Sequence, residues 1–469
     1  MKSGEPLAVS DGLPQPQRRQ AVWVIVLGIT LAVLDGSIVN LALPGIAREL
    51  NAAASQAIWV VNAYQIASLV TLLPLAALGE RLGYRRVYLV GMALFVLASV
   101  AATFATSLTT LTAARALQGL GAAGILSVNS AMVRLIYPSA RLGRGIAINS
   151  MVVATSAMAG PTVAALILSV ASWPWLFALN VPLGLLTLWM GRRALPVNPM
   201  RTHAPPVFSL LDVLLNVLMF TLVFLGAEQL GVRGDAAAGA SLNGWALLAG
   251  GVGIGAIYLR RQWSLTAPLF PLDLLRLPVF ALSMGASVGA FCAQMLAFLS
   301  LPFLLLEVHG RSHLEAGLLL TAWPLATVLV APIAGRLIGR YPDGALGGVG
   351  MAVFALGLLL LGLLPDQPSS ANLVWRLMLC GAGFALFQSP NNHTIVTTAP
   401  LHRSGAASGM LGTARLTGQT LGALMLAAIY AAWNSHDGQG EAIAMYLAAA
   451  CAVLSGVSSS LRVRAATLR

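Results

Sequence analysis

The arginines of this chain concentrate in every second gap between long apolar stretches. The stretches are about 18–25 residues long, the length that crosses the roughly 30 Å hydrocarbon core of a bilayer as a helix. Charged residues make up only 9% of the 469 residues and apolar residues 58%, with a mean hydropathy of +0.83. A soluble chain of this size needs far more surface charge. The sequence therefore predicts an all-α membrane protein.

Fourteen apolar stretches can be placed along the chain. Their approximate ranges are 22–44, 57–78, 87–106, 109–131, 145–168, 173–191, 209–230, 241–259, 279–306, 314–335, 345–364, 372–390, 405–432 and 440–461. Twenty-one of the 27 basic residues lie in the tails and the even-numbered gaps, whereas the other gaps hold only Arg48, Arg233 and Arg311. Because positively charged loops stay inside, both termini are predicted to be cytoplasmic, in a bacterial-type inner membrane.

The net charge of +12 does not indicate a nucleic-acid partner. The arginines are spread over short loops rather than gathered on one face, so we expect them to meet anionic lipid headgroups. The cysteines (Cys292, Cys380 and Cys451) lie in apolar stretches without metal-ligand spacing and are expected to be packing residues. Lys2 is the sole lysine, so there is no P-loop. We expect no metal and no cofactor.

A weak internal duplication divides the chain. At a constant spacing of 262 positions, Gly119, Gly121, Ser127 and Asn129 recur as Gly381, Gly383, Ser389 and Asn391. Parallel repeats of this kind are typical of transporters. The predicted parts are a tail (1–20), a six-helix bundle (21–195), a linker with inserted helices seven and eight (196–271), and a second six-helix bundle with its tail (272–469).

Asp35 lies near the middle of the first stretch, about 13 residues or ~20 Å past its start. A carboxylate at that depth costs roughly 2.5–3.5 kcal/mol on insertion scales, so such a residue is usually functional. It can bind and release a proton as its exposure changes. The alternative is a structural carboxylate paired with an arginine or a polar neighbour.

Three arginines also lie inside apolar stretches. Arg115 and Arg415 are candidate counter-charges for a carboxylate and are assigned to the proton-coupling site with Asp35. Arg376 lies only four residues into its stretch, where its side chain can extend to the interface.

Polar and aromatic side chains within the stretches are candidates to line a substrate cavity. They are Asn62, Tyr64, Gln65, Gln118, Gln294 and Glu228. Trp59 is a further candidate, although a tryptophan at a helix start is more often an interfacial anchor than a ligand contact. The remaining acids at stretch ends (Asp212, Glu307 and Glu441) are expected at headgroup level.

Four segments match motifs of one transporter family. They are LDGSIVNLALP (34–44), RALQGLGAA (115–123), AGP (159–161) and SWPWLFALNVPLG (172–184). On these segments the chain resembles the major facilitator superfamily, and within it the fourteen-span drug:proton antiporters. The resemblance implies proton coupling at Asp35, proton transfer at Arg115, and an antiporter motif at Gly160 and Pro161. Pro161 also removes a backbone hydrogen bond and can bend its helix.

The loop after the second stretch resembles the family's gating motif, G-x-L-A-D-R-x-G-R-[RK]. The matching residues are Glu80, Arg81, Gly83 and Arg85, with Glu80 in place of the aspartate, Ala76 in place of the first glycine and Tyr84 in place of an arginine. In the second-half copy, Gly339 stands where an acid is expected. The resemblance therefore implies an altered gate in the first half and a lost relay in the second.

The resemblance implies two six-helix bundles with an inserted two-helix hairpin, and proton-coupled efflux of lipophilic drugs or similar small molecules by alternating access. Family members that extrude divalent cationic drugs tend to carry extra acids in spans 10 and 13. Here span 13 has no carboxylate and span 10 has only Glu315 at its start, so the resemblance implies monovalent, neutral or anionic substrates. An exporter or importer of an endogenous metabolite stays open. A membrane-embedded enzyme is disfavoured, because one carboxylate with scattered arginines is not a catalytic set. The expected partners are protons, lipids and a small-molecule substrate, with the protein acting as a monomer.

Overall fold

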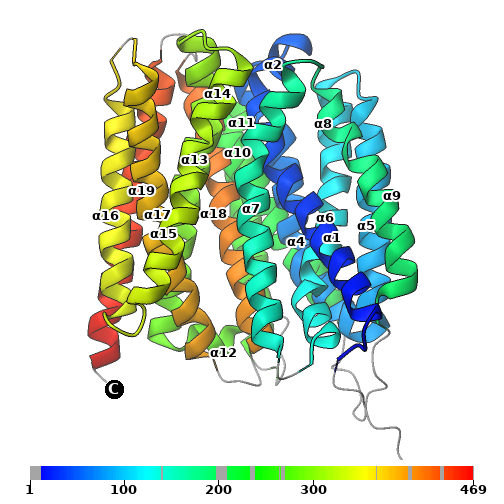
Figure 1. Ribbon diagram of the computed structural model, residues 1–469. Coiled ribbons are helices and arrows are strands. Elements are labelled where there is room, and N and C mark those ends of the chain that lie inside the picture. The colour runs from blue at the N-terminus through cyan, green and yellow to red at the C-terminus, as the bar shows by residue number, and fades with distance from the viewer. Residues whose placement is uncertain are drawn as a thin grey trace, which may run out of the picture.

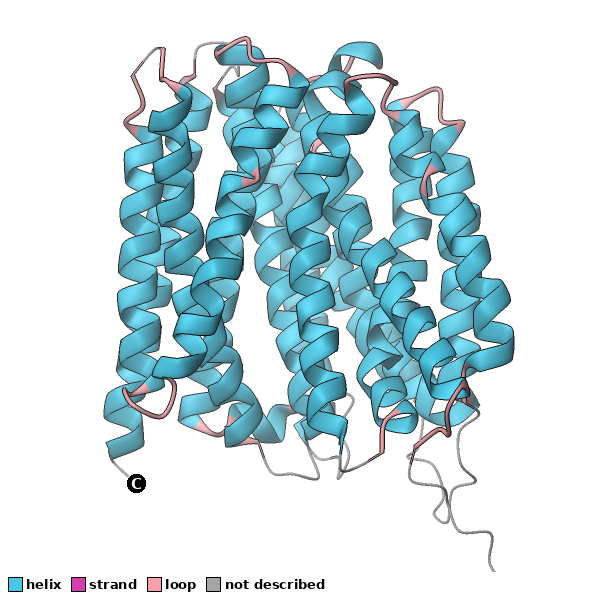
Figure 2. Cartoon of the chain, in the orientation of Figure 1, coloured by secondary structure: helices cyan, strands magenta, loops and turns pink. Residues whose placement is uncertain are grey.

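The chain folds into long helices that lie side by side (Figure 1). The computed structural model describes residues 12–138, 141–196, 209–232, 238–263, 265, 270–365, 367–399, 404–433 and 438–467. Within these ranges the named elements are all helices (Figure 2). This follows from the apolar sequence, since backbone groups in hydrocarbon must be bonded within their own element. The predicted linker at 197–208 lies outside the described residues.

The first group of helices covers the first six predicted stretches. It consists of α1 (Gln17–Ile38), η1 (Val39–Ala42), α2 (Leu43–Glu49), α3 (Ala54–Ala57), α4 (Trp59–Leu82), α5 (Tyr84–Thr103), α6 (Leu108–Ile136), α7 (Leu142–Leu168), α8 (Pro174–Ala178) and α9 (Asn180–Ala194).

The remaining helices follow in the same order as the predicted stretches. They are α10 (Leu210–Val232), α11 (Ala238–Trp263), α12 (Leu272–Leu275), α13 (Pro278–Phe303), η3 (Leu304–Val308), α14 (His313–Leu320), α15 (Ala322–Leu337), α16 (Asp343–Gly362), α17 (Ser370–Thr398), α18 (Ser404–Ala432) and α19 (Gln439–Thr467). The start of α1 and the end of α19 lie at the same end of the molecule (Figure 1).

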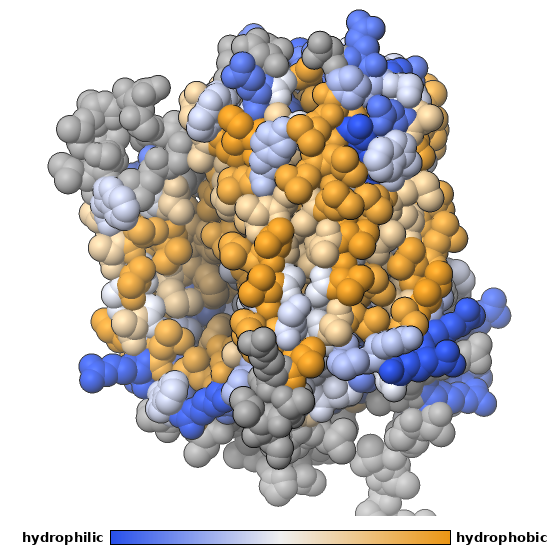
Figure 3. Space-filling model, turned by 90° about the vertical axis from the view of Figure 1, so that its left-hand side faces the viewer, coloured by the Kyte–Doolittle hydropathy of each residue, from blue (hydrophilic) through white to orange (hydrophobic). Residues whose placement is uncertain are grey.

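Eleven helical segments among the described residues are long and apolar enough to cross a membrane. The protein is thus a multi-pass helical membrane protein, and the count of fourteen spans stays a prediction. Three helices outside that set, α7, α11 and α18, coincide with predicted stretches. On the face shown in Figure 3, apolar side chains cover the middle of the molecule, and hydrophilic ones gather toward its two ends. That distribution is the one a bilayer requires.

The duplicated glycines make equivalent close contacts in both halves. A Cβ atom on Gly119 would lie 2.3 Å from the Tyr64 carbonyl oxygen of α4, and one on Gly381 would lie 2.1 Å from the Trp323 carbonyl oxygen of α15. Ser68 donates a hydrogen bond to the Gly119 carbonyl, and Thr327 donates one to the Gly381 carbonyl. Small residues at these positions let the helix backbones touch.

The helices α10 and α11 lie against each other and also against the first and last parts of the chain. A Cβ on Gly226 of α10 would lie 2.6 Å from the Leu248 nitrogen of α11. Asn216 of α10 donates a hydrogen bond to the Val70 carbonyl of α4 at 2.9 Å, and Phe224 packs with Leu416 of α18. The pair therefore contacts both α4 and α18.

Candidate proton-coupling and substrate site

The Asp35 carboxylate is fully buried and binds side chains from two other helices. Its Oδ2 atom lies 2.5 Å from Nη1 of Arg115 on α6. Its Oδ1 atom accepts hydrogen bonds from Nε2 of Gln118 at 2.9 Å and from Nδ2 of Asn180 on α9 at 2.7 Å. Asp35 and Arg115 are each 1% exposed. Both oxygens of a membrane-embedded carboxylate are therefore satisfied within the protein.

Hydrogen bonds and aromatic rings surround the Arg115 guanidinium. Its Nε donates to the Val60 carbonyl of α4 at 3.0 Å, and Nη1 also donates to Oε1 of Gln118 at 2.6 Å. The guanidinium lies over the Tyr64 ring, 4.3 Å from its centroid, and 5.6 Å from that of Phe177. Burying a charge pair is tolerable only when the remaining donors and acceptors are satisfied in this way.

The Asp35 cluster, which we define as Asp35, Arg115, Gln118, Asn180 and Ser99, ties four helices together. Ser99 of α5 accepts a hydrogen bond from Gln118 at 2.9 Å. A change in the charge of Asp35 would therefore be felt in α1, α5, α6 and α9 at once.

The sequence identified two members of this cluster by their charge and a third, Gln118, as a residue of the cavity. In the structure Gln118 binds Asp35 and Arg115 directly. Asn180 and Ser99 were not anticipated. The available signal for Asn180 was a polar residue inside the family-like segment SWPWLFALNVPLG.

Tyr64 connects the Asp35 cluster to α1 and to α18. Its hydroxyl donates to the Ala32 carbonyl of α1 at 2.9 Å, and its ring supports Arg115. On the other side, Arg415 of α18 lies close enough to Tyr64 for an electrostatic interaction. Hydrogen bonds and ion pairs of the described residues do not join Arg415 to Asp35, so its role in proton coupling stays a prediction.

The remaining cavity candidates have different surroundings. Asn62 and Gln65 of α4 are buried, and both polar atoms of the Asn62 side chain and Oε1 of Gln65 have no hydrogen-bond partner. Nε2 of Gln65 lies 3.7 Å from Sδ of Met295 on α13. Gln294 is half-buried on α13, and the Glu228 side chain lies outside the described residues. Asn62 and Gln65 thus lie where the first part of the chain faces α13.

The predicted gating residues surround the turn between α4 and α5. Gly83 has a φ of 102°, a conformation that strongly favours glycine. Arg85 donates a hydrogen bond to the Arg192 carbonyl at the end of α9. Glu80 is half-buried at the end of α4, whereas Arg81 is exposed. The turn is therefore fastened to α9 at the end of the molecule where α1 begins.

Gly160 and Pro161 pack α7 between α1 and α14. A Cβ on Gly160 would lie 2.0 Å from Oγ of Ser37, so α1 leaves no room for a side chain there. On α14, a Cβ on Gly317 would lie 2.9 Å from the Pro161 carbonyl. One turn of α7 thus contacts helices from both parts of the chain.

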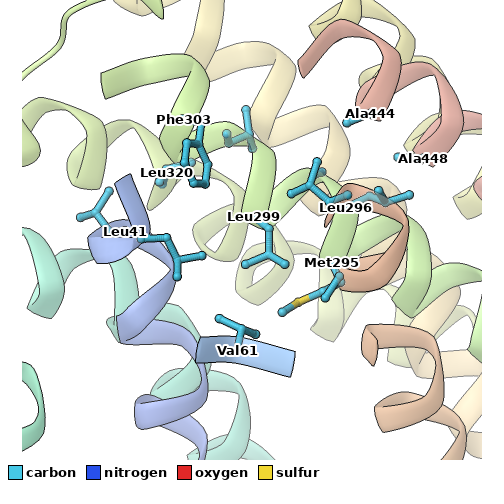
Figure 4. Close-up of a cluster of buried hydrophobic side chains, with 14 of the residues drawn as sticks. Leu41, Val61, Met295, Leu296, Leu299, Phe303, Leu320, Ala444 and Ala448 are labelled. Carbon is cyan, nitrogen blue, oxygen red and sulfur yellow. The ribbon is translucent and has the colours of Figure 1, made fainter. Parts of the chain in front are cut away.

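Apolar side chains close the end of the molecule opposite the chain termini. Leu41 of η1 and Val61 of α4 lie close to Met295, Leu299 and Phe303 of α13 (Figure 4). We call these five residues the apolar seal. Beyond it, Nε of Arg48 on α2 lies 3.3 Å from Oε1 of Glu307 on η3. At this end the two parts of the chain are in contact.

The Glu441 side chain at the start of α19 is fully buried in the protein near Tyr430 of α18. The expectation that it lies at headgroup level stays a prediction.

Comparison with known proteins identifies the family. The profile of the Major Facilitator Superfamily matches residues 25–423, so the chain belongs to this superfamily of transporters. It is therefore a membrane transporter and not an enzyme.

Particular relatives carry different descriptions. The chain is 50% identical to the "Uncharacterized transporter YebQ" of Escherichia coli over 98% of both chains. It is 32% identical to the "Multidrug resistance protein Stp" of Mycobacterium tuberculosis, over 87% of this chain and 75% of the relative. It is 29% identical to the "Riboflavin transporter RibZ" of Clostridioides difficile, over 87% of both chains. The latter two descriptions refer to small molecules, namely drugs and riboflavin.

The fold is similar to that of solved transporters. The crystal structure of the POT family transporter PepTSo aligns with 96% of this chain and 99% of its own, with a TM-score of 0.72 and 15% sequence identity. This likeness establishes the arrangement of the helices.

Proposed function

We propose that the protein exports lipophilic small molecules across the inner membrane in exchange for protons, by alternating access. The observation that carries the proposal is the buried Asp35–Arg115 pair, a titratable group deep in a membrane-spanning helix. The similarity to a multidrug resistance protein supports export of such compounds. The proton gradient is the only energy source that this mechanism needs.

Protonation of Asp35 is the proposed coupling step. A neutral carboxyl attracts Arg115 much less than a carboxylate does. Its O–H group also needs an acceptor, whereas Arg115, Gln118 and Asn180 all present N–H donors to Asp35. The Asp35 cluster must then rearrange, and with it the packing among α1, α6 and α9. Because Asp35 is 1% exposed in the state described here, proton exchange requires another conformation. This requirement links the proton to the opening of the helices.

The apolar seal is the proposed outer gate. The positive-inside rule puts the chain termini in the cytoplasm, so the sealed end would face outward. Release of substrate would then require Leu41 and Val61 to separate from Met295 and Leu299. The Arg48–Glu307 pair would part in the same movement.

The test is dye transport into inverted membrane vesicles with an imposed proton gradient. We expect the wild type to accumulate lipophilic dyes, an uncoupler to stop accumulation, and Asp35→Asn to show no response to the gradient. Asp343→Asn is the matched control, because Asp343 is a partly exposed carboxylate paired with His393. Accumulation by Asp35→Asn with an unchanged response to the gradient would contradict the proposal.

A second candidate is transport of one endogenous metabolite. The similarity to a riboflavin transporter favours it. Competition distinguishes the two candidates: a drug exporter accepts many unrelated dyes that compete with one another, whereas a metabolite transporter is inhibited by one compound and its close analogues.

A further inference from the structure

Arg415 is a cation inside the membrane-spanning part of the protein without an ion-pair partner among the described residues. Its Nε atom is buried and has no hydrogen-bond partner in the part of the chain that the structure describes. The carboxylates of the described ion pairs bind other cations, namely Arg48, Arg115, Arg261 and His393. Removing a guanidinium from water without a counter-anion is costly. An anion that binds beside Arg415 would offset this cost.

The neighbours of Arg415 on α18 pack against α4, the helix that carries Tyr64. Its neighbour Leu416 packs with Ile66 and Leu69 of α4. One turn earlier, a Cβ on Gly412 would contact Leu72 at 3.2 Å. The guanidinium interacts electrostatically with Tyr64, whose ring also supports Arg115. Arg415 therefore lies between α18 and α4, where the two parts of the chain meet.

Two buried amides on α4 add unused hydrogen-bonding groups to the same region. Asn62 and Gln65 are three residues apart and share a face of the helix. Asn62 offers both a donor and an acceptor without partners, and Gln65 offers an acceptor. Buried polar atoms that lack partners are rare in proteins and need an explanation. A bound substrate with oxygen or nitrogen atoms supplies one.

We propose that Arg415 binds an anionic group, such as a sulfonate, carboxylate or phenolate, on an otherwise apolar aromatic substrate, with Asn62 and Gln65 as further polar contacts. The proposal rests on the transport function above and narrows its substrate class. The apolar surface around Val61 and Met295 suits the aromatic body (Figure 4). Because α4 carries Tyr64, whose ring supports Arg115, substrate bound beside Arg415 would also affect the helix that supports Arg115.

A matched pair of dyes tests the charge preference. 1-Anilinonaphthalene-8-sulfonate is anionic, and N-phenyl-1-naphthylamine is the same body without the sulfonate. Binding of each is measured to purified full-length protein in nanodiscs, with empty nanodiscs subtracted. We expect the wild type to bind the sulfonate more tightly, and Arg415→Gln to weaken sulfonate binding by about tenfold or more while leaving the neutral dye within about twofold. Arg415→Lys should retain part of the preference.

Arg376→Gln is the control, because Arg376 lies in another helix and donates to the Leu360 carbonyl; it should leave the dye preference unchanged. Equal affinity of the wild type for both dyes, or an equal loss of both in Arg415→Gln, would overturn the proposal. Neither result affects proton coupling, which the vesicle assay with Asp35→Asn decides separately. A variant that elutes as an aggregate is replaced by Arg415→Met, for which the same outcomes apply.

Discussion

The first and second parts of the chain share a helix-packing pattern but differ in what they bury at the positions of Arg115 and Gln118. Around Gly119 and Gly381 the backbone contacts are nearly the same. Yet Arg115 and Gln118 of α6 correspond, at the repeat spacing, to Leu377 and Cys380 of α17, both fully buried. An ionic cluster in one half is thus replaced by an apolar core in the other.

The second half places its buried arginine elsewhere. Arg462 of α19 donates to Oδ1 of Asn391 at 2.7 Å and to Oγ of Ser283 at 3.0 Å. These partners are neutral, and Arg462 forms no ion pair among the described residues. The comparison teaches that a duplicated scaffold can conserve its packing while, among the described residues of the two bundles, only the first carries a fully buried ion pair.

The largest effect is expected when Arg115 is replaced by leucine, the residue at the equivalent position of the second half. Arg115→Leu leaves the Asp35 charge buried without its counter-ion, which costs about 3–5 kcal/mol of folding free energy. We expect loss of transport and a much lower melting temperature in detergent. The double variant Arg115→Leu with Asp35→Asn should recover most of the stability and none of the proton coupling. Equal melting temperatures for the single and double variants would contradict this reading.

The next effect tests the feature that the halves share. Gly119→Ala places a Cβ 2.3 Å from a backbone oxygen, and Gly381→Ala places one 2.1 Å from a backbone oxygen. Overpacking of this kind costs about 1–3 kcal/mol, so both variants should lose similar stability, measured by thermal unfolding. Gly285, where a Cβ would meet nothing within 4 Å, is the control position. A large effect at one glycine alone would show that the packing is not equivalent.

A smaller effect is expected for Asn180→Ala. It removes one of the two amide hydrogen bonds to Oδ1 of Asp35, and hydrogen bonds to charged groups contribute about 1.5–3 kcal/mol. Transport should slow but remain dependent on the proton gradient, since the Asp35–Arg115 pair is retained. Vesicle uptake and thermal unfolding measure the two effects. Unchanged stability would mean that Asn180 does not support the carboxylate.

The smallest effect on stability is expected from breaking the contact between His393 and Asp343 in the second half. His393 and Asp343 lie 2.7 Å apart with side chains 46% and 20% exposed. Exposed pairs contribute about 0–1 kcal/mol, so Asp343→Asn should change stability by less than about 1 kcal/mol and leave dye uptake intact. A loss of gradient-driven uptake would place coupling in both halves.

Sequence reasoning found the charged residues of the site but not their surroundings. Asp35 and Arg115 stood out because charges inside apolar helices are costly and rare. Asn180 and Ser99 did not, because a small polar residue in an apolar stretch is common. Whether Asn180 and Ser99 face the Asp35 cluster depends on how α9 and α5 are rotated about their axes. Hydrophobic periodicity does not predict this rotation when a helix is apolar on all sides.

The same limit applies to the partners of other polar residues. Glu441 begins α19, and sequence alone does not show that its side chain is fully buried within the protein. Gln118 was expected to face a cavity, and in the structure it donates a hydrogen bond to Asp35. The repeat, by contrast, was readable from glycine spacing, because close backbone contacts leave no alternative to glycine.

The central claim is that Asp35, in one half alone, exchanges the proton that drives transport. The most direct measurement is proton release or uptake by purified protein in a weakly buffered solution, with a pH-sensitive dye, when a transported substrate is added. The account predicts a substrate-dependent proton change for the wild type and for Asp343→Asn, and none for Asp35→Asn. A proton change of the same size in Asp35→Asn, with substrate still binding, would contradict it.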